Sequence, residues 1–188
     1  EIRDFVAGKT AWLTKYMALV PEKIKFQYVT GEIHHVFGRA YPLQVCLGMR
    51  EDAVVSKDGE LQLLLRTKQR EREKVFKAGM KRILLWEIEK QLETWTKRMA
   101  IPESRITGVT IRVMKSRWGS CRRVTGRFSF ALDLVTKPKE CIEAVVVHEL
   151  CHLFAAGHGP DFYARMETYL PDYKERDRLL SSLPRELV

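Results

Sequence analysis

The chain has 188 residues, a formal net charge of +9, 45% hydrophobic residues and 30% charged residues. This size and balance fit one globular domain and exclude a disordered chain, and no apolar run reaches the roughly 20 residues that a membrane span needs. The four cysteines form no C-x-x-C pair and the N-terminus has no apolar signal-peptide core, which together predict reduced thiols in a cytoplasmic protein without a membrane partner.

The first third of the chain changes from a helical to a β pattern. Apolar residues at helical spacing predict a helix over residues 3–19, within an N-terminal segment 1–20. Residues 26–66 are rich in β-branched and aromatic residues, and Asp58-Gly59 between two apolar runs predicts a hairpin. The adjacent His34 and His35 fall in a strand pattern, where neighbours point to opposite faces, and are interpreted as structural.

A long amphipathic helix is predicted over residues 68–100, ahead of Pro102. Apolar residues recur there every three or four positions and predict a stripe that faces the core. The residues of this stripe are Phe76, Met80, Leu84, Ile88, Leu92, Trp95 and Met99.

Residues 106–188 contain two strand-like stretches followed by three helical ones. Strand alternation at 106–115 and 127–135 flanks the sequence SRWGSC, and a strongly apolar helix follows Pro138. Two short helices are predicted from Pro160 and Pro171. Strands followed by helices predict an α+β fold, which we expect to form a single domain over residues 1–188.

The apolar helix after Pro138 carries His148, Glu149 and His152 as an H-E-x-x-H motif. On a helix, residues four apart lie about 6 Å apart along the axis and about 40° apart around it. Both imidazoles can therefore bind one metal ion. In this motif the histidines hold zinc and the glutamate acts as general base toward water on the metal. The motif predicts one Zn²⁺ per chain and a catalytic Glu149.

A catalytic zinc needs a third protein ligand and an open position, and His158 is the candidate. If the helix continued, His158 would lie about 9 Å beyond His152 and about 240° around the axis. Gly157 is therefore predicted to end the helix in the left-handed conformation. Cys151 lies three residues after His148 and offers an alternative thiolate, but three histidines already fill such a site, so Cys151 is interpreted as a buried packing residue.

Together these motifs resemble the YgjP-like metallopeptidase family, which is related to SprT-type zinc proteases. The likeness runs from about residue 3 to residue 182 and rests on RVMKSRWGSC, VVVHELCHL, GHGPDFY and LPDYKERDRLL. It implies a zincin-like fold in which a metal-binding helix lies beside a small sheet whose edge strand aligns an extended peptide. It also implies a polypeptide substrate, His148, His152 and His158 as ligands, and Glu149 as the catalytic residue. A metzincin is excluded, because Ala155 replaces the glycine of that motif and no convincing Met-turn follows.

Residues 112–127 hold six basic residues and no acidic one: Arg112, Lys115, Arg117, Arg122, Arg123 and Arg127. This charge favours a polyanion such as nucleic acid or a nucleotide, and SprT-type relatives act on proteins bound to DNA. Alternation across a strand would, however, leave half of these residues on one face.

Two other functions remain open. One is a zinc-dependent nucleoside triphosphate pyrophosphatase or other phosphoanhydride hydrolase, although the chain has no P-loop and no carboxylate cluster for magnesium. The other is a nucleic-acid-associated protein with a structural zinc, in which Glu149 would have no use as a base. For peptide hydrolysis, Arg117 and Tyr163 are candidate donors to the oxyanion.

Overall fold

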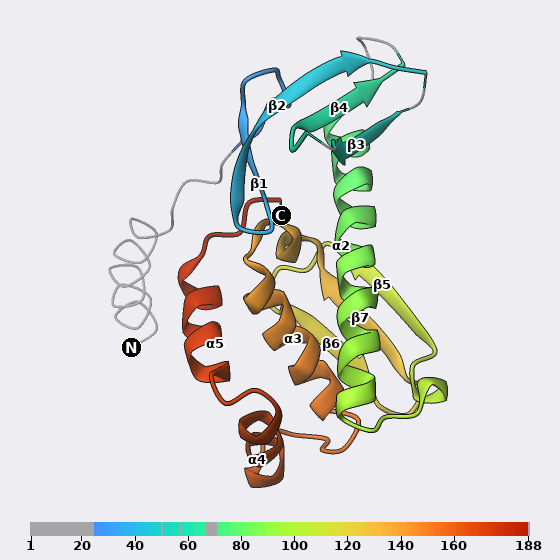
Figure 1. Ribbon diagram of the computed structural model, residues 1–188, viewed down its shortest axis with the longest axis vertical. Helices are drawn as coiled ribbons and strands as arrows, with labels where there is room; N and C mark the ends of the chain where they lie inside the picture. Colours follow the sequence, from blue (N-terminus) through green and yellow to red (C-terminus); the bar gives the residue numbers. More distant parts are fainter. Residues whose placement is uncertain (1–24, 50, 57, 67–70, 188) are drawn as a thin grey trace, which may run out of the picture.

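The computed structural model describes residues 25–49, 51–56, 58–66 and 71–187 (Figure 1). The helix predicted over residues 3–19 lies outside them. Four strands lie within the expected β-rich segment, namely β1 (Ile33–Val36), β2 (Arg39–Leu47), β3 (Asp52–Val55) and β4 (Leu61–Leu65). They form one sheet in the order β1-β2-β4-β3, in which β2 and β4 are parallel and the other pairs antiparallel. Gly59 has a φ of 80° in the turn that joins β3 to β4, as the Asp-Gly hairpin signal predicted.

Helix α2 (Arg72–Arg98) extends from the first sheet along the second (Figure 1). The predicted apolar stripe on this helix is buried, with every member at most 5% exposed. The stripe therefore packs in the core, where it contacts β3 and β4 near one end and β5 further along. The helix ends before Pro102, as expected from the missing N–H of proline.

The second sheet has the order β5-β7-β6 and consists of β5 (Gly108–Arg112), β6 (Gly119–Arg122) and β7 (Arg127–Ala131). The short 3₁₀ helix η1 (Glu103–Arg105) precedes it. The sequence pattern did not predict β6, which begins within SRWGSC and ends at Arg122. The strand predicted over 127–135 is too long, because the chain turns after Ala131 into the buried 3₁₀ helix η2 (Leu132–Thr136). Asp133 in this turn is fully buried and its Oδ1 accepts the N–H groups of Glu186 and Leu187, at 2.7 Å each.

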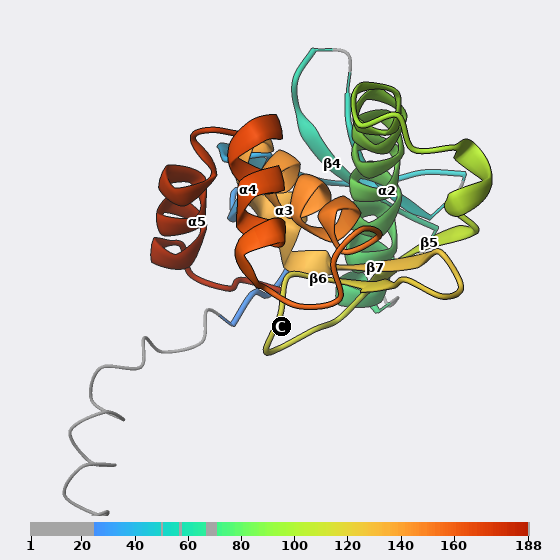
Figure 2. The same ribbon diagram turned by 90° about the horizontal axis from the view of Figure 1, so that it is seen from below.

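Three helices complete the fold: α3 (Lys139–Cys151), α4 (Pro160–Tyr169) and α5 (Tyr173–Ser182). Figure 2 shows α3 between α4 and α5 on one side and the second sheet on the other, and α3 contacts α2, α4, α5 and β6. Apolar side chains from both sheets and from the helices form one buried cluster. The fold is α+β, as predicted, and α3 lies at its centre. None of the helices in the described ranges is both long and apolar enough to cross a membrane.

Candidate metal centre

Helix α3 ends at Cys151, and His152 is its C-terminal cap. The expectation that Gly157 ends this helix is wrong, because the φ of Gly157 lies outside the left-handed region. The chain instead leaves the helix through a tighter, 3₁₀-like turn. The N–H groups of Leu153 and Phe154 each donate to the carbonyl oxygen three residues earlier, at 3.0 Å. The His152 Nδ1–H then donates to the Ala155 carbonyl at 3.2 Å and stabilises the turn.

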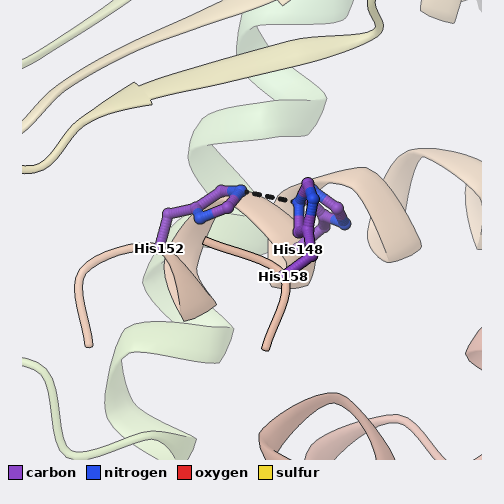
Figure 3. A group of neighbouring side chains, drawn as sticks. All are labelled: His148, His152 and His158. Carbon is purple, nitrogen blue, oxygen red and sulfur yellow. Dashed lines mark hydrogen bonds between the residues drawn. The ribbon is translucent and has the colours of Figure 1, made fainter. Parts of the chain in front are cut away.

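The turn brings the three histidine side chains together (Figure 3). The Nε2 atom of His158 lies 3.1 Å from Nε2 of His148 and 3.2 Å from Nε2 of His152. A tetrahedral zinc ion with Zn–N bonds of about 2.0–2.1 Å would hold neighbouring nitrogens about 3.3 Å apart. All three residues offer a ligand atom within 4.8 Å of the others. Their arrangement therefore fits a single metal ion.

The protonation states of the cluster also suit a metal. Burial, together with the neighbouring imidazoles of His152 and His158, lowers the pKa of His148 to about 4. Burial likewise lowers the pKa of His152. Neutral imidazole is the form that binds metals. Because His152 donates from Nδ1, its Nε2 is left as the free acceptor.

Phe162 on α4 supports all three imidazoles from one side. Its ring centroid lies 4.9, 4.8 and 4.7 Å from those of His148, His152 and His158, and the residue is 1% exposed. Packing of this kind restricts the rotamers of the histidines and holds their nitrogens in place. No sequence pattern singled out Phe162, which lies in the GHGPDFY stretch.

Glu149 follows the first histidine and is 5% exposed. Its Oε2 is buried and has no hydrogen-bond partner among the described residues. Burial raises the pKa of the carboxyl group to about 8, while the cation of Arg117 acts in the opposite direction. A buried carboxylate without a partner is costly unless a positive charge or a donor lies beside it. A metal ion on the three histidines, with its water, would supply both.

Gly119 at the start of β6 leaves room for the Glu149 carboxylate. A Cβ atom added at Gly119 would lie 2.5 Å from Glu149 Oε1 and 2.8 Å from its Cδ. Any side chain here would therefore displace the carboxylate. This contact gives the glycine of SRWGSC a physical role, and it joins two segments that are 30 residues apart in the sequence.

We expect Gly119→Ala to lower hydrolytic activity by about 10²-fold, the scale on which a 1 Å misplacement of a catalytic group acts. The metal content should not change, because the added methyl group meets the mobile end of Glu149 and not a histidine. The control is Gly108→Ala at the start of β5, where an added Cβ meets nothing within 4 Å. Wild-type activity in purified, zinc-loaded Gly119→Ala would show that the position of the carboxylate is not critical.

A cavity of about 590 Å³ opens beside the histidines and Glu149, and both candidate oxyanion donors line it. Arg117 precedes β6, whereas Tyr163 lies on α4 with 45% of its surface exposed. The ring of Tyr163 lies 6.4 Å from that of His158, between centroids. The two side chains border the same cavity from different elements, near the histidine cluster.

The basic stretch does not act as one surface. All six of its cations are exposed, but Arg117 and Arg123 line the cavity. Arg122 and Arg127 are instead directly opposite each other on β6 and β7, on the face away from the buried Phe128. These four cations therefore lie at two different places, the cavity and the exposed face of the second sheet.

The C-terminal segment holds the loop that carries Arg117. The guanidinium of Arg185 lies 3.7 Å from the ring centroid of Trp118, and it donates to the carbonyl oxygens of Met114 at 2.8 Å and Arg117 at 3.2 Å. Trp118 is thus a packing residue next to the site. No pattern in the sequence indicated that a residue near the C-terminus would order this loop.

The other histidines and cysteines considered from the sequence lie in structural environments. Cys151 is fully buried outside the histidine cluster, and burial raises its thiol pKa to about 11, which disfavours a thiolate ligand. His34 is 1% exposed and bonds to Glu32 at 2.9 Å, while His35 bonds to Glu186 at 3.0 Å. All four cysteines are free.

Comparison with known proteins finds one matching family. A sequence model described as YgjP-like, metallopeptidase domain, matches residues 1–183. The solved metallopeptidase zymogen of Pyrococcus abyssi abylysin is 24% identical, with a TM-score of 0.46 over 54% of this chain and 99% of its own. That of Methanocaldococcus jannaschii jannalysin is 20% identical, with a TM-score of 0.44 over 50% of this chain and 93% of its own. Among curated proteins, none matches.

Proposed function

The chain belongs to the YgjP-like metallopeptidase family, and we propose that it is a zinc-dependent peptidase whose ligands are His148, His152 and His158. The observation that carries the proposal is the convergence of three Nε2 atoms, two of the distances being 3.1 and 3.2 Å, beside the buried Glu149 carboxylate. We further propose that residues 1–188 act as one domain with a zincin-like fold, since the match spans residues 1–183 and both sheets share one buried cluster.

Zinc is the metal that best suits this donor set, because three neutral imidazoles with one open position are typical of catalytic zinc sites. Membership of a metallopeptidase family implies a metal, and the geometry fits one ion per chain. When bound, zinc acts as a Lewis acid that acidifies water and polarises a carbonyl group.

Glu149 is proposed as the general base. Its carboxylate accepts a proton from the attacking water and then returns it to the leaving amine. Its burial favours this role, because an unsolvated carboxylate with an unpaired Oε2 is ready to accept a hydrogen bond from water. Gly119 leaves room for the other carboxylate oxygen, Oε1, against β6.

Arg117 and Tyr163 are proposed to stabilise the oxyanion that forms when the peptide carbonyl is attacked. A donor must lie within about 3 Å of this oxygen to be effective. Both side chains are exposed and line the cavity, so both border the space that a bound substrate would occupy.

Strand β6 is proposed to align the polypeptide. It is an edge strand of the second sheet, in the order β5-β7-β6. An edge strand has backbone groups free to pair with an extended peptide, which gives affinity that does not depend on the peptide sequence. Because β6 passes Glu149 at Gly119, a paired peptide would run past the histidine cluster.

Family membership supports a polypeptide substrate and gives no support to nucleic acid or nucleotides as partners. The division of the basic stretch between cavity and sheet face also weakens the case for one extended polyanion surface. We therefore favour neither the phosphoanhydride hydrolase nor the structural zinc protein.

The test of the proposed function is removal of the metal. Protein stripped with a chelator should lose cleavage of an unfolded protein substrate, and about one equivalent of zinc per chain should restore it. Zinc content is measured by elemental analysis and cleavage by mass spectrometry of the fragments. Undiminished cleavage by metal-free protein would reject a zinc peptidase.

A further inference from the structure

The cavity beside the histidines extends away from β6 along three helices. On α5, Tyr173, Asp177 and Leu180 line it at positions three and four apart, which is the spacing of one helix face. On α4, Tyr163 and Met166 line it in the same way. Helix α3 adds Ala144 and Val145 from the turn that precedes His148. We call this part of the cavity the α4–α5 subsite.

Most of the α4–α5 subsite is apolar or aromatic. Met166 and Leu180 are each 2% exposed and form part of its lining. The rings of Tyr163 and Tyr173 stack at 6.4 Å between centroids with 24° between their planes. Such a lining suits a long side chain that carries several methylene groups.

One charge lies within this apolar lining. Among the described residues that border the cavity, Asp177 and Glu149 are the acidic ones. Asp177 is exposed, and no cation pairs with it in the described part of the chain. It therefore presents a solvated carboxylate beside the apolar lining.

The neighbouring cations of α5 contact other groups, and Arg178 donates to the carbonyl oxygen of Lys174 at 3.2 Å. Arg176 pairs with Glu143 at 2.5 Å and with Asp172 at 2.9 Å, and Lys174 pairs with Glu167 at 2.9 Å. Within the described ranges, the negative charge of Asp177 is therefore left without a cation and is available to a bound ligand.

We propose that the α4–α5 subsite binds a lysine or arginine side chain of the polypeptide substrate, with its methylene stem on the apolar lining and its cationic end at Asp177. The inference rests on the proposed peptidase function. Long cationic side chains commonly place their stem on apolar surface and their charged end in water, and a guanidinium also stacks well on the face of a tyrosine ring.

The opposite end of the cavity has the opposite charge. Arg117 and Arg123 line it near β6, where the buried Glu149 also lies, so the exposed charges of the cavity are cationic toward the sheet and anionic toward α5. An acidic side chain would be repelled from Asp177 and attracted by the arginines. The cavity thus favours one chain direction for a substrate that carries both a basic and an acidic side chain.

The test compares peptides that contain arginine or citrulline at one position, because citrulline keeps the shape and removes the charge. The peptides are acetylated at the N-terminus and amidated at the C-terminus. A series of peptides places the arginine or citrulline at successive positions on either side of the cleavage site, which is located by mass spectrometry. At one position the zinc-loaded wild type should cleave the arginine peptide about 2- to 5-fold faster in kcat/KM, the range expected of an exposed ion pair. Asp177→Asn should remove this preference, and Asp177→Lys should reverse it.

The matched control is Glu175→Gln, which removes an exposed acid of α5 that does not line the cavity and should keep the preference. Equal cleavage of arginine and citrulline peptides at every position, or a preference that survives Asp177→Asn, would overturn the inference. A further comparison uses citrulline peptides with a free or an acetylated N-terminus. Faster cleavage of the free-amine peptide that depends on Asp177 would show that this carboxylate binds the peptide N-terminus instead of a basic side chain, and would overturn the inference.

A binding measurement separates this inference from the proposed function. Zinc-loaded Glu149→Gln protein should bind the arginine peptide about 2- to 5-fold more tightly than the citrulline peptide in fluorescence polarisation, whether or not the wild type cleaves either one. Cleavage without any charge preference would reject the subsite and keep the peptidase. Charge-selective binding without zinc-dependent cleavage of any substrate would keep the subsite and reject the peptidase.

Discussion

Glu149→Gln is expected to lower kcat/KM for peptide hydrolysis by about 10²–10⁴-fold, the usual contribution of a general base. The amide has the same shape as the carboxyl group but cannot accept a proton from water. The side chain is buried beside the histidines, so the substitution keeps the packing of α3 and the space left by Gly119. Zinc content and thermal stability should therefore remain close to those of the wild type.

The control for this substitution is Glu140→Gln, which changes an exposed glutamate in the first turn of the same helix. It should leave kcat/KM unchanged. Full activity of Glu149→Gln, measured on protein shown to hold one zinc per chain, would contradict the assignment of Glu149 as base.

His158→Ala is expected to weaken zinc binding by at least about 100-fold. Loss of an outer-shell partner alone typically costs about 10–100-fold in metal affinity, and His158 is placed as a direct ligand, with its Nε2 3.1 and 3.2 Å from those of the other two histidines. Two histidines on one helix leave zinc short of a ligand. The dissociation constant is measured by competition with a chromophoric chelator.

Peptide hydrolysis should fall with zinc occupancy in this variant and recover in part at high zinc concentration, because Glu149 is still present. His35→Ala is the control, since His35 lies on β1 and outside the histidine cluster. Unchanged zinc affinity in His158→Ala would remove this residue from the ligand set.

The sequence predicted the features that depend on short spacing. The interval between His148 and His152 sets their relative position on any helix, and the repeat from Phe76 to Met99 determined which face of α2 is buried. Asp58-Gly59 likewise predicted the turn of the β3–β4 hairpin, because only a few residues can adopt its backbone conformation.

The end of α3 shows the limit of this reasoning. Gly157 was a sound candidate for a helix end, yet the helix ends at Cys151, where the chain tightens and the His152 side chain bonds to Ala155. His158 reaches the cluster as expected, but by a different backbone path. Several paths can satisfy one geometric requirement, and local propensity does not choose among them.

By itself, the sequence determined which residues we propose to carry the chemistry, namely the three histidines and the glutamate of one short segment. The tertiary structure decided what surrounds them: Gly119 against the carboxylate, Phe162 against the imidazoles, and Asp177 of α5 in the lining of the same cavity. The reason is physical. Helix and strand periods fix the relations between residues a few positions apart, whereas contacts between distant segments depend on how whole elements pack into one core.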